Sequence, residues 1–151
     1  MAILNKHILF VCTGNTCRSP MAQAIAQRII SELDSPRFSI SVDSAGVAAG
    51  EGYQASPQAV EALAQRQIDL SGHQSKMITP ELVQQADLIF TMTPAHTQAV
   101  IGLVQGAIEK VFPLDARHPI GDPFGQPVEV YCDVADELKR LIQIRLEEIL
   151  A

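Results

Sequence analysis

The stretch HILFVCTGNTCRSP, residues 7–20, decides the beginning of the fold. Its first part, from His7 to Val11, is a short run with β-branched and aromatic residues, which predicts a buried strand. From Pro20 to Leu33 apolar residues recur at helical spacing, which predicts an amphipathic helix. A strand, a tight loop and a helix in direct succession indicate the start of a βαβ unit.

The rest of the chain continues this alternation. Three further strands are predicted at residues 38–42, 87–92 and 110–114. Ser56-Pro57 combines a capping side chain with a proline suited to the first helical position, so a helix is expected from there through about Gln67. Thr79-Pro80 predicts a shorter helix in the same way. Two more helices are predicted at residues 94–105 and 133–150.

Strands separated by helices are typical of a parallel sheet that is covered on both faces. We therefore expect an α/β fold with one three-layer domain over residues 1–151, a four-stranded parallel sheet and helices on both faces. Ligands of such folds bind at the carboxyl ends of the strands. This rule directs attention to the loops after Val11 and Leu114.

The composition fits one domain without a nucleic-acid or membrane partner. The chain has 151 residues, of which 47% are hydrophobic and 19% charged, and this excludes a disordered chain. Eleven Lys and Arg against 17 Asp and Glu give a net charge of −6, which argues against a broad nucleic-acid surface and fits a monomer. Three cysteines do not suggest a disulfide scaffold, and residues 1–7 lack the apolar stretch of a signal peptide. We expect a cytoplasmic protein.

The loop after the first strand is suited to bind an anion. It lacks the ending of a Walker loop and the glycines of a dinucleotide fingerprint. A tight loop that leads into a helix still points backbone N–H groups at an anion. Cys12 would lie at the base of that cradle, where the positive potential favours the thiolate. Arg18, which follows Cys12 after five intervening residues, would hold two phosphoryl oxygens through its planar guanidinium.

Residues 10–22, FVCTGNTCRSPMA, resemble the active-site loop of the low-molecular-weight protein-tyrosine phosphatase family. Three later segments resemble the family in the same order, namely residues 43–46 (DSAG), 72–73 (GH) and 122–125 (DPFG). Within the family the chain is most similar to the bacterial protein-arginine-phosphatase branch, because of Thr16 and Phe124-Gly125. Tyrosine-directed members usually carry an aliphatic residue in place of Thr16 and an aromatic pair after Asp-Pro.

The resemblance implies phosphate hydrolysis through a cysteinyl-phosphate intermediate, with no metal and no cofactor. Cys12 would be the nucleophile. Arg18 and the loop amides would stabilise the charge on the phosphoryl oxygens. Asp122 would protonate the leaving group and then activate water, although an Asp before a Pro also commonly begins a turn. The phosphate-binding loop would comprise Thr13, Gly14, Asn15, Thr16, Cys17, Arg18 and Ser19.

The resemblance also implies a supporting network of Asn15, Ser19, Ser44 and His73. Ser19 could in addition donate a hydrogen bond to the Cys12 thiolate. Simpler interpretations remain open: Asn15 tolerates a left-handed turn, Ser19 can cap the helix, and His73 can be a surface residue.

The other cysteines and histidines carry weaker signals. Cys17 is close enough to Cys12 for a reversible, redox-sensitive disulfide that would protect the nucleophile, or it is a small buried loop residue. Cys132 is expected in the core or at the surface. The remaining histidines, His7, His96 and His118, lack the spacing of metal ligands.

Phosphoarginine in proteins is the favoured substrate, with Thr16 and Phe124 as specificity residues. Tyr53 and Phe124 are the expected aromatic walls of the cleft. Phosphotyrosine remains the alternative, although Thr93 stands where tyrosine-directed members often have an acidic residue. An arsenate reductase on the same fold would need a downstream cysteine pair, and this chain has only Cys132 there. A catalytically dead phosphoprotein-binding module should have lost one of the three catalytic residues.

Overall fold

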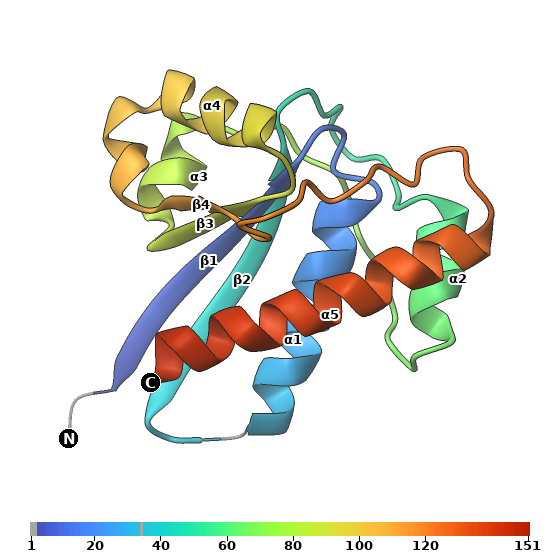
Figure 1. Ribbon diagram of the computed structural model, residues 1–151, viewed down its shortest axis with the longest axis horizontal. Coiled ribbons are helices and arrows are strands. Elements are labelled where there is room, and N and C mark those ends of the chain that lie inside the picture. Colours follow the sequence, from blue (N-terminus) through green and yellow to red (C-terminus); the bar gives the residue numbers. More distant parts are fainter. Residues whose placement is uncertain (1–2, 34) are drawn as a thin grey trace.

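The computed structural model describes residues 3–33 and 35–151 and contains the predicted four-stranded parallel sheet (Figure 1). Met1 and Ala2, which belong to the expected domain, lie outside the described residues. The sheet order is β2-β1-β3-β4, and every neighbouring pair is parallel. The strands are β1 (Leu4–Cys12), β2 (Phe38–Gly46), β3 (Leu88–Thr91) and β4 (Val111–Pro113).

The helices lie in two layers, with α1, α2 and α5 on one face of the sheet and α3 and α4 on the other (Figure 1). Their bounds are α1 (Arg18–Leu33), α2 (Pro57–Ala64), α3 (Pro80–Gln85), α4 (Pro94–Leu103) and α5 (Val128–Leu150). A 3₁₀ helix (Gln105–Glu109) follows α4. No helix in the described part of the chain is long and apolar enough to cross a membrane.

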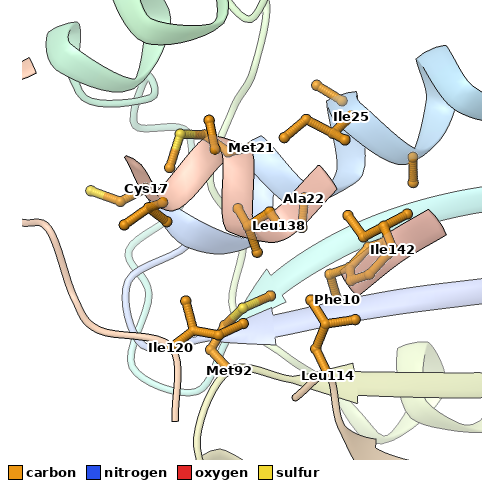
Figure 2. Close-up of a cluster of buried hydrophobic side chains, with 14 of the residues drawn as sticks. Phe10, Cys17, Met21, Ala22, Ile25, Met92, Leu114, Ile120, Leu138 and Ile142 are labelled. Atoms are coloured by element: carbon orange, nitrogen blue, oxygen red, sulfur yellow. The ribbon is translucent and has the colours of Figure 1, made fainter. Parts of the chain in front are cut away.

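The side chains of β1 alternate between the two layers, as expected for a central strand. Ile8 and Phe10 pack with the layer of α1 and α5, whereas Leu9 and Val11 pack with the layer of α3 and α4. Since both faces are buried, the strand reads as a solid apolar run in the sequence. Figure 2 shows the first of these cores, where residues of α1 and α5 cover Phe10.

Proline and hydroxyl side chains begin three helices. Ser56 accepts a hydrogen bond from the Ala59 N–H and Thr79 accepts one from the Leu82 N–H, which confirms both predicted caps. Thr93 caps α4 in the same manner.

Several boundaries differ from the predicted ones. α1 begins at Arg18, two residues before Pro20, because proline is tolerated within the first turn of a helix. α2 ends at Ala64, before Gln67, whose φ of 57° is left-handed and incompatible with a continuing helix. β2 continues to Gly46, since it pairs with β1 over nine residues. α5 begins at Val128, directly after Pro127 and five residues before the predicted start.

Candidate active site

The loop from β1 to α1 is attached on its outer side to the segment after β2. The carbonyl groups of Cys12 and Thr13 accept hydrogen bonds of 2.9 Å from the N–H groups of Val47 and Ala48. The carbonyl of Thr16 accepts another from Ser56. Because these carbonyls are bonded to a neighbouring segment, the loop is fixed at the carboxyl edge of the sheet, where the fold predicts a ligand site.

Asn15 is the centre of the loop's internal hydrogen bonds. Its φ is 56°, a left-handed conformation that asparagine tolerates, and its side chain is fully buried. Its Nδ2 donates to Ser19 Oγ at 2.8 Å and to Ser44 Oγ at 3.0 Å. The His73 Nε2 lies 2.7 Å from the Asn15 carbonyl oxygen. Asn15 therefore contacts each of the other three residues named as a supporting network.

Two charged residues, which the sequence did not single out, extend this network. The backbone N–H of Lys76 donates to Asn15 Oδ1 at 3.0 Å. The ammonium group of Lys76 forms an ion pair with Asp43 at 2.6 Å. Burial lowers the pKa of His73, and the nearby Lys76 lowers it further, against the opposing effects of its bond to Asn15 and of Asp43. The imidazole beside the loop is therefore kept neutral.

Cys12 lies at the end of β1 and its side chain is buried, with Sγ 2.9 Å from Ser19 Oγ. A hydroxyl at this distance can donate to a thiolate. The contact agrees with the donor role considered for Ser19.

Arg18, in the first turn of α1, is 4% exposed. Its Nη1 donates to the Ile120 carbonyl at 2.9 Å, and its Nη2 lies 3.7 Å from Asp122 Oδ2. Its Nε is buried without a hydrogen-bond partner among the described residues. A buried donor without a partner is costly, so this guanidinium is suited to hold a further anionic group.

A pocket of about 210 Å³ opens over the loop. Its lining residues are Cys12, Thr13, Gly14, Thr16, Cys17, Arg18, Asp122 and Phe124. Asp122 is half exposed and accepts a hydrogen bond from the Phe124 N–H, as in a turn. The structure thus brings the three predicted catalytic residues to one pocket. The expectation for Tyr53 is wrong, because its backbone bonds to Ser75 and it does not line this pocket.

Cys17 lines the pocket and also packs in the core below it. Its Sγ lies 3.4 Å from the Tyr131 hydroxyl and 3.5 Å from Ser56 Oγ. Burial, first, and the contact with Cys17 together raise the pKa of Tyr131 to about 12. Cys12 and Cys17 are both free thiols. Cys132 is half-buried, between the core and surface positions that were expected, with Sγ 3.6 Å from Gln65 Oε1.

His96 is a site residue whose contact with the loop the sequence did not predict. Its Nε2 lies 2.8 Å from Thr13 Oγ1, and its side chain is buried. Burial, first, and the nearby charge of Arg18 lower the pKa of His96 to about 4, against the opposing effect of Asp122. The Thr93-Pro94 cap could have indicated this position, since it puts residue 96 in the first turn of a helix at the carboxyl edge of the sheet.

No group of three or more His, Cys, Asp or Glu residues suited to hold a metal ion occurs among residues 3–33 and 35–151.

The chain is similar to known phosphatases over most of its length. The family model for "Low molecular weight phosphotyrosine protein phosphatase" matches residues 7–150. A protein-arginine-phosphatase of Bacillus subtilis is 40% identical over 141 residues, covering 90% of this chain and 91% of the relative. A probable low molecular weight protein-tyrosine-phosphatase, EpsP, of Ralstonia nicotianae is 36% identical over 89% of this chain and 90% of the relative.

A solved structure of a YwlE arginine phosphatase, a mutant with a phosphorylated active-site serine, has the same fold. Its TM-score is 0.89 at 37% identity, and the match covers 95% of each chain. The sheet order, the loop after β1 and the matched length together assign the chain to a family. It belongs to the low molecular weight phosphotyrosine protein phosphatase family.

Proposed function

We propose that this chain is a cysteine-dependent protein phosphatase whose preferred substrate is phosphoarginine in proteins. One observation carries the proposal: Cys12 Sγ lies at the base of a pocket that Arg18 and Asp122 also line, 2.9 Å from the Ser19 hydroxyl. A nucleophile, an anion-binding guanidinium and an acid in one small pocket are the groups that phosphoryl transfer through an enzyme intermediate requires.

The reaction proceeds in two displacements. In the first, the Cys12 thiolate attacks phosphorus, a P–S bond forms, and the bond to the leaving nitrogen breaks as Asp122 supplies that nitrogen with a proton. In the second, Asp122 takes a proton from water, the water oxygen bonds to phosphorus, and the thiolate leaves. The Ser19 hydroxyl stabilises the departing thiolate by donating to it.

Arg18 and the loop amides hold the phosphoryl group during both steps. The guanidinium is fixed through Nη1 to the Ile120 carbonyl, so its buried Nε and its Nη2 remain to contact phosphoryl oxygens. A donor that is oriented before the substrate arrives needs no reorganisation as charge develops in the transition state.

Thr16 and Phe124 support the preference for phosphoarginine. Both line the pocket, Thr16 within the loop and Phe124 beside the acid, where it is 72% exposed. The Thr16 hydroxyl can form a hydrogen bond with a guanidinium, which an aliphatic side chain cannot. The similarity to the arginine phosphatase of Bacillus subtilis supports the same substrate, and the similarity to EpsP keeps phosphotyrosine as the second candidate.

The proposal includes the setting of the enzyme. The substrates are phosphorylated proteins, and the enzyme acts in the cytoplasm as a single-domain monomer over residues 1–151, without nucleic acid. The net charge of −6 supports the absence of a nucleic-acid partner.

A side-by-side assay of phosphoarginine and phosphotyrosine peptides, without added metal, tests the proposal. We expect faster turnover of the phosphoarginine peptide, no effect of a chelator, and no turnover by Cys12→Ser, which keeps the size of the side chain but not the thiolate. Substantial turnover by a clean Cys12→Ser preparation would refute the cysteinyl-phosphate mechanism. Faster turnover of the phosphotyrosine peptide would refute only the substrate preference.

A further inference from the structure

His96 connects α4 with the phosphate loop although the two lie far apart in the sequence. The imidazole is 4% exposed and contacts two threonine hydroxyls, with Nε2 2.8 Å from Thr13 Oγ1 and Nδ1 3.1 Å from Thr93 Oγ1. Thr13 follows the nucleophile directly and lines the pocket. The two-step mechanism above makes no use of His96 or of the Thr13 side chain.

We infer the tautomer of His96 from the hydrogen bonds at Thr93. Thr93 Oγ1 accepts from the His96 backbone N–H at 3.4 Å as the cap of α4. Its own proton is then available for Nδ1, which makes Nε2 the protonated nitrogen of the neutral ring. The Nε2–H donates to Thr13 Oγ1, so the Thr13 proton is available to a group bound in the pocket.

We propose that His96 is a positioning residue: it orients the Thr13 hydroxyl so that this hydroxyl donates to a phosphoryl group bound in the loop. The proposal rests on the cysteine phosphatase function but does not depend on the preference for phosphoarginine. His96 is anchored by the first turn of α4 and by β3, which precedes it, and so the orientation of Thr13 is set by an element outside the loop.

Two substitutions at position 96 test the contributions of the two imidazole nitrogens separately. The Gln side-chain amide reaches the position of Nε2, whereas the shorter Asn amide reaches only that of Nδ1. With para-nitrophenyl phosphate as substrate, we expect His96→Asn to lower kcat/KM about tenfold, the effect of one lost hydrogen bond. We expect His96→Gln to retain kcat/KM within about threefold. The inhibition constant of inorganic phosphate should rise with the loss in His96→Asn.

A double-mutant cycle with Thr13→Val shows whether His96 acts through Thr13. We expect Thr13→Val alone to lose about as much kcat/KM as His96→Asn, and the double variant to lose no more than either one. The proposal would be overturned if the losses of kcat/KM in the two single variants were additive, or if His96→Asn and His96→Gln were equally active. A merely structural role of His96 predicts both of these results. Thr97→Val is the matched control on α4, since the Thr97 hydroxyl bonds to Thr91 and to the Thr93 carbonyl.

If His96→Asn does not fold at the assay temperature, two substitutions of Thr13 test the proposal instead. Thr13→Ser keeps the hydroxyl and should retain kcat/KM, whereas Thr13→Val should lose it, and equal activity of the two would overturn the proposal. The proposed function would instead be refuted if the wild-type protein did not hydrolyse para-nitrophenyl phosphate, or if Cys12→Ser were fully active. These outcomes differ from those that would overturn the role of His96, so failure of the proposed function can be told apart from failure of the His96 proposal.

Discussion

Thr16 is the residue on which the proposed preference for phosphoarginine depends most directly. Its hydroxyl lies in the pocket 3.8 Å from Cys17 Sγ, a separation at which it is not strongly engaged within the loop. We expect Thr16→Ile to depress phosphoarginine hydrolysis about ten- to a hundredfold, because a polar guanidinium left without a partner costs about 1–3 kcal/mol.

Phosphotyrosine hydrolysis by Thr16→Ile should hold or improve, since an aliphatic side chain packs against a phenyl ring. The ratio of kcat/KM for the two peptides measures the change. Parallel losses on both peptides would reduce Thr16 to a packing residue and remove the main support for phosphoarginine.

Asp122 is the general acid of the proposed mechanism. We expect Asp122→Asn to slow hydrolysis most for substrates with poor leaving groups, because these need the proton in the transition state. Activated aryl phosphates should lose less. A series of aryl phosphates with graded leaving-group pKa provides the measurement, and an equal loss across the series would show that Asp122 only shapes the turn it forms with Phe124.

Cys17 allows a test of redox sensitivity. Mild peroxide should inactivate the wild-type enzyme reversibly through a bond between Cys12 and Cys17, both of which line the pocket. In Cys17→Ser the nucleophile has no partner thiol, so recovery with a reductant should fall as the thiolate is oxidised to sulfinic acid. Identical recovery of the two proteins would leave Cys17 as a packing residue against Tyr131.

The residues that the sequence could predict are those within one continuous motif. The spacing of Cys12 and Arg18 is visible in the sequence because both belong to a single loop. His96 and Lys76 lie outside that motif and reach the loop from distant segments. For Lys76 the sequence carries no signal, and for His96 the only signal is the Thr93-Pro94 cap, which indicates its position but not its contact with Thr13. Tyr53 was assigned to the pocket on its aromatic character alone, which says nothing about direction.

At the scale of elements, the end of β2 approaches the phosphate loop so closely that only glycine fits. A Cβ at Gly46 would overlap the Thr13 carbonyl oxygen and lie 3.0 Å from the Asn15 nitrogen, both backbone atoms of the loop. We expect Gly46→Ala to cost about 1–3 kcal/mol of unfolding free energy, because the strand end or the loop must shift.

The same shift should lower kcat/KM of Gly46→Ala at least about tenfold, because displaced loop amides bind the transition state less well. Urea denaturation and steady-state kinetics measure the two effects. Gly102→Ala is the control, since a Cβ there meets no atom within 4 Å and the position is inside α4. Unchanged kinetics of Gly46→Ala would mean that the loop adapts to the methyl group.

The existence and type of the elements could be predicted better than their ends. Each predicted strand and helix is present, because apolar patterns reflect burial directly and the Ser56-Pro57 and Thr79-Pro80 signals reflect local capping. The ends depend on tertiary contacts: β2 is extended by its pairing with β1, and α2 is shortened by the left-handed Gln67. The early start of α5 follows Pro127, a signal that the sequence contained and the prediction overlooked.

At the scale of the whole molecule, histidines whose pKa is lowered in the folded protein link stability to pH. The pKa of His96 is about 4 in the folded protein, below the ordinary value of about 6.5 that the unfolded chain has. Below pH 6.5 the unfolded chain therefore binds a proton that the folded protein does not. Stability should fall as the pH drops from 6.5 to 4 and then level off, so far as this group is concerned.

Between pH 7 and pH 5 this histidine should remove about 2 kcal/mol of unfolding free energy. His73, whose pKa is also lowered, acts in the same direction. Urea denaturation at the two pH values gives the measurement, with His96→Gln as the matched variant, because it removes the titrating group. An equal pH dependence of wild type and His96→Gln would show that the histidine is not neutral in the folded protein.

The backbone of Ile120 is hydrogen-bonded on both sides. Its N–H donates to the Met92 carbonyl after β3, and its carbonyl accepts from Arg18. Asp122 follows this fixed point by two residues, so its Cα cannot move further than about 7 Å from it. One carboxyl group confined to a sphere of that radius has an effective concentration of about 1 M. The hydrogen-bonded Ile120 backbone therefore keeps the Asp122 carboxyl group close to the phosphate-binding loop, even when the exposed turn that follows Asp122 rearranges.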